Sequence, residues 1–137
     1  RIPGAGGAPT FETVVATQAE MEAASSLTVY APPGRVQYHP GVPKGWVDFT
    51  AAGVVNISYN VTSVTDGGIG DWTVNWNVDF SADHTDQATE RGGNLGAARI
   101  TQIGNFTVGT TTIRMFDAAG TAADTQAGVG VVAWGDQ

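Results

Sequence analysis

Residues 72–80 read WTVNWNVDF, and apolar and polar residues alternate in this stretch without an exception. A period of two is typical of a strand that buries one face. We therefore expect a strand over 72–80 whose buried face consists of Trp72, Val74, Trp76, Val78 and Phe80. Core packing is the favoured role of Trp72 and Trp76, rather than a platform on which sugars stack. For Trp46 and Trp134 the pattern leaves both roles open.

Short runs rich in valine, threonine and isoleucine flank this stretch, and turn residues separate them. We expect strands over 46–49, 54–60, 98–103, 106–108, 111–116 and 129–134, with 61–65 as a continuation of the second. The glycines of 66–71 predict a tight hairpin, and the nearly apolar run 129–134 predicts a central strand. Strands at this spacing predict an all-β fold, either an antiparallel β-sandwich or a jelly-roll-like barrel.

The N-terminal part of the chain has a different character. Residues 1–9 read RIPGAGGAP and predict an extended arm. Thr17 and Glu20 fit a capping box that would begin one short helix, in which Met21 would face a partner surface. Prolines recur over 31–44 and predict an extended connector. We therefore expect 1–44 to comprise the arm, the helix and the connector, and 45–137 to form the β-sandwich domain.

The composition narrows the class of function. The chain is 42% hydrophobic and 14% charged, with a net charge of −7 and no cysteine. Negative charge and scattered basic residues predict no nucleic-acid partner. The sequence has no run of the about 18 apolar residues that a membrane span requires. Low charge favours an oligomer that buries additional surface. Because residue 1 is arginine, we expect either processing or a chain that continues upstream.

Residues 81–97 are polar and contain glycine, which predicts a long loop. Within it, Asp83, His84, Asp86 and Arg91 are the candidate binding residues. The carboxylates of Asp79, Asp83 and Asp86 and the imidazole of His84 could converge on a divalent ion, but the spacing fits no calcium or zinc motif. A solvated loop is the favoured interpretation, and we expect no metal and no cofactor.

Catalysis has little support in the sequence. His39 lies in the proline-rich connector, and no nucleophile or second catalytic group is evident near it. A glycosidase needs a pair of carboxylates, but Asp66 and Asp71 flank a turn, where aspartate usually bonds to its own backbone. We therefore expect that the protein is not an enzyme.

One combination of short motifs resembles a known family. The run ATQAEMEA at 16–23, Val29 and Tyr30, PGR at 33–35 and YHP at 38–40 resemble a segment that recurs in tail fibres and related virion proteins of tailed bacteriophages. The resemblance continues in KGWVDF at 44–49, SYNVTSVTD at 58–66, GDWTVN at 70–75 and the closing GDQ at 135–137. It covers about half of the chain and does not extend to residues 81–128.

This resemblance implies a non-enzymatic virion structural protein of the tail-fibre or spike type, which forms a homotrimer. The protein would lie at the surface of the extracellular particle, take part in assembly and attach to the host. Its partners would be other phage structural proteins of the tail or capsid, and a host surface glycan or receptor, without membrane insertion. Assembly and attachment would use Thr17, Glu20, Met21, Pro32, Pro33, Arg35, Tyr38 and His39. The loop that contains Asp83, His84, Asp86 and Arg91 would contact the receptor. A capsid decoration protein and a cellular carbohydrate-binding module are the alternatives.

Overall fold

The structure is a computed structural model, and it describes residues 15–24, 29–92 and 98–137. The chain divides into two compact units, Arg1–His39 and Pro40–Gln137. The division falls inside the segment 31–44 that the prolines predict as a connector. The arm expected over residues 1–9 lies outside the described residues.

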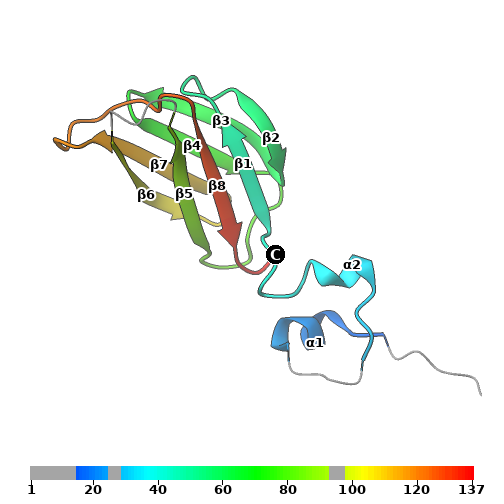
Figure 1. Ribbon diagram of the computed structural model, residues 1–137. Helices are drawn as coiled ribbons and strands as arrows, with labels where there is room; N and C mark the ends of the chain where they lie inside the picture. Colours follow the sequence, from blue (N-terminus) through cyan, green and yellow to red (C-terminus); the bar gives the residue numbers. More distant parts are fainter. Residues whose placement is uncertain (1–14, 25–28, 93–97) are drawn as a thin grey trace, which may run out of the picture. The chain divides into compact units, whose positions relative to one another are not determined.

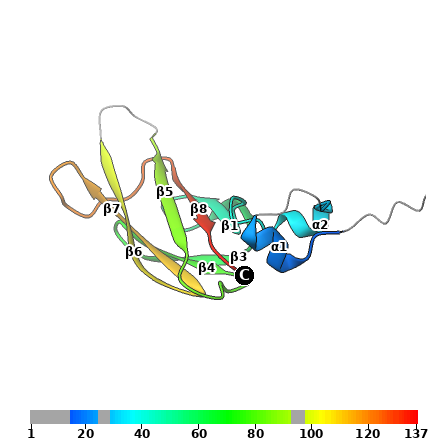
Figure 2. The same cartoon turned by 90° about the horizontal axis from the view of Figure 1, so that it is seen from below.

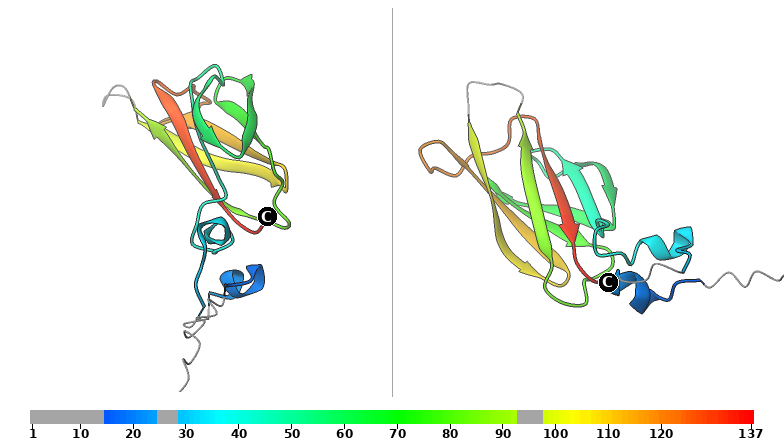
Figure 3. Two further views of the ribbon diagram at one scale, coloured as in Figure 1. Left: turned by 90° about the vertical axis from the view of Figure 1, so that its right-hand side faces the viewer. Right: turned by 60° about the horizontal axis from the view of Figure 1, so that its bottom comes forward.

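The second unit is a sandwich of two antiparallel sheets (Figure 1). One sheet has the strand order β2-β1-β8-β5 and the other has the order β3-β4-β7-β6. The strands are β1 (Gly45–Phe49), β2 (Val55–Tyr59), β3 (Val61–Gly68), β4 (Asp71–Trp76), β5 (Thr85–Arg91), β6 (Arg99–Thr107), β7 (Thr110–Asp117) and β8 (Gly128–Trp134). The sheets form separate layers in the views of Figures 2 and 3, and no ladder between the described strands joins them into a barrel. The predicted all-β antiparallel sandwich is confirmed.

The core lies between the two sheets. Burial alternates along β4 as predicted for residues 72–76, so that Trp72, Val74 and Trp76 are buried. Trp72 also donates its indole N–H to the carbonyl oxygen of Ala51 at 2.7 Å, so its polar atom is satisfied. The facing sheet contributes apolar side chains from β1 and β8, namely Val47, Phe49, Val129, Val131 and Ala133. β8 lies between β1 and β5, which confirms the prediction of a central strand.

The strand predicted over 72–80 ends early, at Trp76. Val78 is 51% exposed and is not part of the buried face, although Phe80 is buried. Asn60 accounts for the difference, because its side chain occupies the polar groups of the backbone at Val78. Its Oδ1 accepts the N–H of Val78 at 2.8 Å, and its Nδ2 donates to the carbonyl oxygen of Val78 at 3.1 Å.

The sequence predicts residues 61–65 as a continuation of the preceding strand, but they belong to a separate strand, β3. The backbone turns at Asn60, which has a φ of 57° in the left-handed region that asparagine tolerates. β3 then pairs with β4 in the opposite sheet. The two strands predicted over 98–103 and 106–108 are in turn one strand, β6, with a change of register between Ile103 and Phe106.

The prediction of a long loop over 81–97 is also wrong in part, because β5 lies within this range. β5 pairs with β8 along its whole length. Its inward positions, opposite the buried residues of β8, are Asp86, Ala88 and Glu90. Since none of these is a large apolar residue, the alternation that identifies a half-buried strand is missing from the sequence.

The described part of the first unit, residues 15–24 and 29–39, contains two short helices. α1 (Gln18–Ala23) begins after Thr17 with the predicted capping box: the N–H of Glu20 donates to Thr17 Oγ1 at 3.3 Å, and the N–H of Thr17 donates to Glu20 Oε2 at 2.8 Å. α2 (Pro33–Val36) replaces part of the expected extended connector, because the fixed φ of proline suits the first turn of a helix. None of the helices in the described part of the chain has the length and apolar character needed to cross a lipid bilayer.

Candidate functional site

The residues predicted for assembly all lie in the first unit, and most of them have local roles there. Thr17 and Glu20 cap α1, and hydrogen bonds from the N–H and the hydroxyl of Thr17 lower the pKa of the Glu20 carboxyl. Met21 is the buried residue of α1 and lies with His39 in the lining of one small depression.

The remaining predicted residues surround α2. Pro32 precedes its first turn and Pro33 is its first residue. The guanidinium carbon of Arg35 lies 5.9 Å from the centre of the Tyr38 ring, a distance at which cation and ring attract. The N-terminal motifs therefore order a small unit of their own. Among these side chains, the shared depression of Met21 and His39 is the feature that a partner could fill.

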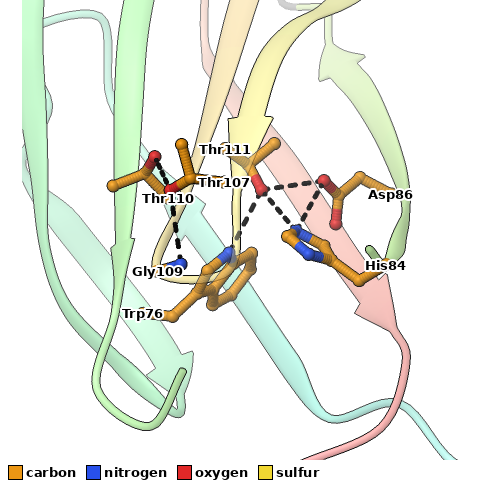
Figure 4. A network of polar contacts seen from close by, with 7 residues as sticks. All are labelled: Trp76, His84, Asp86, Thr107, Gly109, Thr110 and Thr111. Carbon is orange, nitrogen blue, oxygen red and sulfur yellow. Dashed lines mark hydrogen bonds and ion pairs between the residues drawn. The ribbon is translucent and has the colours of Figure 1, made fainter. Parts of the chain in front are cut away.

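In the second unit, Thr111 is the centre of a buried polar network (Figure 4). Its hydroxyl donates to Asp86 Oδ2 at 2.7 Å and accepts from Trp76 Nε1 at 3.1 Å. His84 Nε2 lies 3.0 Å from Thr111 Oγ1 and 3.2 Å from Asp86 Oδ2. The side chains of His84 and Asp86 are 0% and 1% exposed, so both lie in the interior and not on the loop surface that the sequence had suggested.

Aromatic rings enclose the imidazole of His84. The ring of Phe80 stacks on it with centroids 4.0 Å apart, and the rings of Trp76 and Phe106 meet it edge-on at 6.3 and 5.5 Å. The Thr111 hydroxyl is 0% exposed and donates to the carboxylate, whereas the nucleophile of a hydrolase triad is accessible and donates to the imidazole. The chemistry of this network is therefore that of a structural link between strands.

Burial raises the pKa of the Asp86 carboxyl, while the hydrogen bond from Thr111 and the nearby His84 lower it in part. Two buried atoms of the pair, His84 Nδ1 and Asp86 Oδ1, have no hydrogen-bond partner among the residues that the structure describes. A carboxyl whose pKa is raised on folding binds a proton more tightly in the folded state than in the unfolded state. Its contribution to stability is therefore largest below the unfolded value of 3.8 and is lost as the pH rises through the raised value.

Replacing Asp86 with asparagine should remove this contribution. We expect the free energy of unfolding of the wild type, minus that of Asp86→Asn, to rise as the pH falls from neutral toward 3.8. Urea unfolding at a series of pH values measures this difference. Asp83→Asn is the control, because it removes the same charge from an exposed position just before β5. Parallel pH profiles for the wild type and Asp86→Asn would contradict the raised pKa.

The outer face of the β2-β1-β8-β5 sheet carries a second feature. Since Val47 and Val131 point into the core, their neighbours along β1 and β8 point outward. The register aligns these outward residues in two rows across the sheet. One row consists of Tyr59, Trp46, Val132 and Gln87, and the next consists of Ile57, Asp48, Gly130 and Thr89.

Gly130 leaves a gap in the second row, because it has no side chain. A shallow depression of about 360 Å³ lies at this point. The outward residues that line it are Trp46, Asp48, Gln87, Thr89, Gly130 and Val132. None of the sequence motifs predicts this site, although the glycine in the middle of the apolar run 129–134 is a signal that could have indicated it.

Asp48 is held in place at the edge of this depression. Its Oδ1 accepts from Asn56 Nδ2 at 2.7 Å and from Arg91 Nη2 at 2.6 Å. Among the described residues, Asp48 Oδ2 makes no hydrogen bond. Arg91, predicted as a receptor residue, therefore belongs to the outer face of the sheet, whereas His84 and Asp86 belong to the interior.

Within residues 15–24, 29–92 and 98–137, no three His, Cys, Asp or Glu side chains are arranged to hold a metal ion. Comparison of the chain with protein-family models, with curated proteins and with solved structures finds no match in any of the three. The candidate sites therefore rest on the geometry of this molecule, and the depression at Gly130 is open to a ligand from solution.

Proposed function

We propose that the protein is a non-enzymatic structural protein of a tailed-phage particle, of the tail-fibre or spike type, which takes part in assembly and host attachment. The observation that carries this proposal is the organisation of the chain. A small N-terminal unit contains the first of the motifs that resemble tail-fibre proteins, and a separate β-sandwich with the remaining motifs follows it. Such a division suits a protein that is anchored by one part and presents the other.

The first unit is the part that we assign to anchoring. α1 spans Gln18–Ala23, which is far below the about 12 residues at which isolated helices become marginally stable in water. Its stability must therefore come from packing against other surfaces. Contact with neighbouring subunits or with other particle proteins would supply such packing.

The sandwich has surface properties that support self-association into the homotrimer. β2 is an edge strand whose residues are all exposed, including Ile57 at 58% and Tyr59 at 49%. Unpaired edges with apolar side chains tend to associate with other chains. Sedimentation or light scattering of the purified protein tests this point, and a stable monomer at micromolar concentration would contradict it.

Labelling of phage particles tests the proposed location. Gold-labelled antibodies against the purified chain, applied to particles of the phage that encodes it, should mark the tail fibres or spikes in electron micrographs. Labelling over the capsid would instead support a decoration protein that stabilises the head. Absence of the chain from purified particles would overturn both assignments.

A carbohydrate-binding module is the second candidate function. The observation that favours it is the depression on the outer face of the β2-β1-β8-β5 sheet, which combines an aromatic side chain with several polar ones. The two candidates are compatible, since a sandwich that binds sugars could serve as the attachment domain of a fibre.

A further inference from the structure

Gly130 lies in the middle of β8, the strand between β1 and β5, where glycine weakens the structure. The backbone does not require it, because Gly130 is not among the glycines with positive φ. Steric crowding does not require it either, since an added Cβ would meet nothing closer than Thr89 Oγ1 at 3.7 Å. At Gly45, by contrast, an added Cβ would lie 2.6 Å from the Trp76 ring. What glycine provides at position 130 is the depression itself.

The depression has an apolar side and a polar side. The row next to Gly130 brings Trp46 and Val132 to it, and the row of Gly130 places Asp48 on one flank and Thr89 on the other. Pyranose rings have faces rich in C–H groups, which pack on aromatic rings, and hydroxyl groups, which bond to carboxylate, amide and hydroxyl side chains. Both kinds of partner are present around this depression.

The charges around the depression favour an uncharged ligand. Asp48 is the acidic residue of its lining, and the ion pair with Arg91 at 2.6 Å balances its charge. Because Arg91 is already paired with Asp48 and no cationic side chain is among those that line the depression, an acidic sugar or a phosphate would find no positive charge to bind it there. A neutral sugar could instead donate hydroxyl hydrogens to Asp48 Oδ2.

We propose that this depression binds a neutral saccharide. One pyranose ring lies over Gly130 with its apolar face against Trp46, and its hydroxyl groups bond to Asp48, Gln87 and Thr89. The role of this site in host attachment rests on the proposed function, whereas sugar binding itself does not. A single shallow site binds weakly, and repetition of the chain on a particle would raise the avidity.

The test uses the full chain labelled with ¹⁵N and follows the indole N–H signals of its four tryptophans. Glucose, galactose, mannose and N-acetylglucosamine are the neutral probes, and glucuronic acid is the acidic one. We expect at least one neutral sugar to shift the signal of Trp46 in a saturable way. The signals of Trp72 and Trp76 should stay in place, because their N–H groups are bonded to Ala51 and Thr111 in the interior.

Gly130→Val supplies the decisive variant, because its side chain fills the depression without a close contact at Cβ. We expect binding to weaken by about tenfold or more while the midpoint of thermal unfolding stays the same or rises. Thr73→Val is the matched control, since it adds the same side chain to a half-buried position on β4 in the other sheet and should leave binding unchanged.

Three results would overturn the inference. They are binding by Gly130→Val equal to that of the wild type, a response of Trp46 to glucuronic acid alone, and no response of Trp46 to any of the sugars. None of these three results tests the proposed place of the protein in the phage particle, which the antibody labelling tests. Conversely, a response of Trp46 together with absence of the chain from particles would support the saccharide site and reject the virion assignment.

Discussion

Replacing Thr111 with valine is expected to lower the free energy of unfolding by about 2–3 kcal/mol, because a buried donor left unpaired costs about 1–3 kcal/mol and Asp86 Oδ2 keeps only its longer contact with His84 Nε2 at 3.2 Å. Valine keeps the shape of threonine, so the loss comes from the missing hydroxyl and not from a cavity. Trp76 Nε1 and Asp86 Oδ2 would lose the partner that they now contact at 3.1 and 2.7 Å. Urea unfolding at neutral pH, followed by tryptophan fluorescence, measures the change.

Thr112→Val is the matched control for this experiment. Thr112 follows Thr111 on β7 and points to the opposite face of its sheet, where it is only half-buried. Its replacement should change stability by no more than about 0.5 kcal/mol, as is usual for surface positions. Equal losses in the two variants would show that the network around Thr111 contributes little.

Gly70→Ala is expected to destabilise the sandwich by about 3 kcal/mol, since it combines backbone strain with overpacking. Gly70 has a φ of 67°, and an added Cβ would lie 2.5 Å from the carbonyl oxygen of Met115. The backbone cannot easily move away, because its N–H donates to Asp124 Oδ1 at 2.7 Å and its carbonyl accepts from Met115 at 2.9 Å.

Gly120→Ala separates the two causes. Gly120 has a similar φ of 81°, but an added Cβ would meet nothing within 4 Å. We therefore expect a loss of only about 1–2 kcal/mol, which is the cost of the left-handed conformation alone. Thermal and urea unfolding of both variants give the comparison. A loss at Gly120 as large as that at Gly70 would contradict the steric contribution of Met115.

The parts of the fold that could be predicted are those in which burial follows the local alternation of residues. β4 carries tryptophan and valine at its inward positions, and β8 is a nearly apolar run with Val129 and Val131 in the core, so the sequence of each indicates a strand. β5 could not be predicted in this way, because Asp86, Ala88 and Glu90 occupy its inward positions. The early end of β4 depends on Asn60, which is distant in sequence and acts through its side chain.

The candidate sites were less predictable than the fold. His84 and Asp86 lie in a polar stretch that suggests a solvated loop, and their burial depends on Thr111 in the opposite sheet. The depression at Gly130 arises from residues on β1, β5 and β8, which only the pairing of these strands brings together. The sequence leaves open whether Trp46 packs in the core or contacts a sugar, and the register of β1 places it on the outer face of the sheet.

The hydrogen bond between Asp86 and Thr111 also bears on how β5 finds its place. A strand with large apolar residues on one face is aligned by hydrophobic burial, since a slip by one residue would expose them. β5 lacks such residues, and among the described strands it is an edge strand that pairs with β8 alone. A slip by one residue would turn Asp86 outward and bring Thr85 or Gln87 into the interior, away from Thr111. The pairing of one carboxylate with one hydroxyl thus selects the alignment of a whole strand.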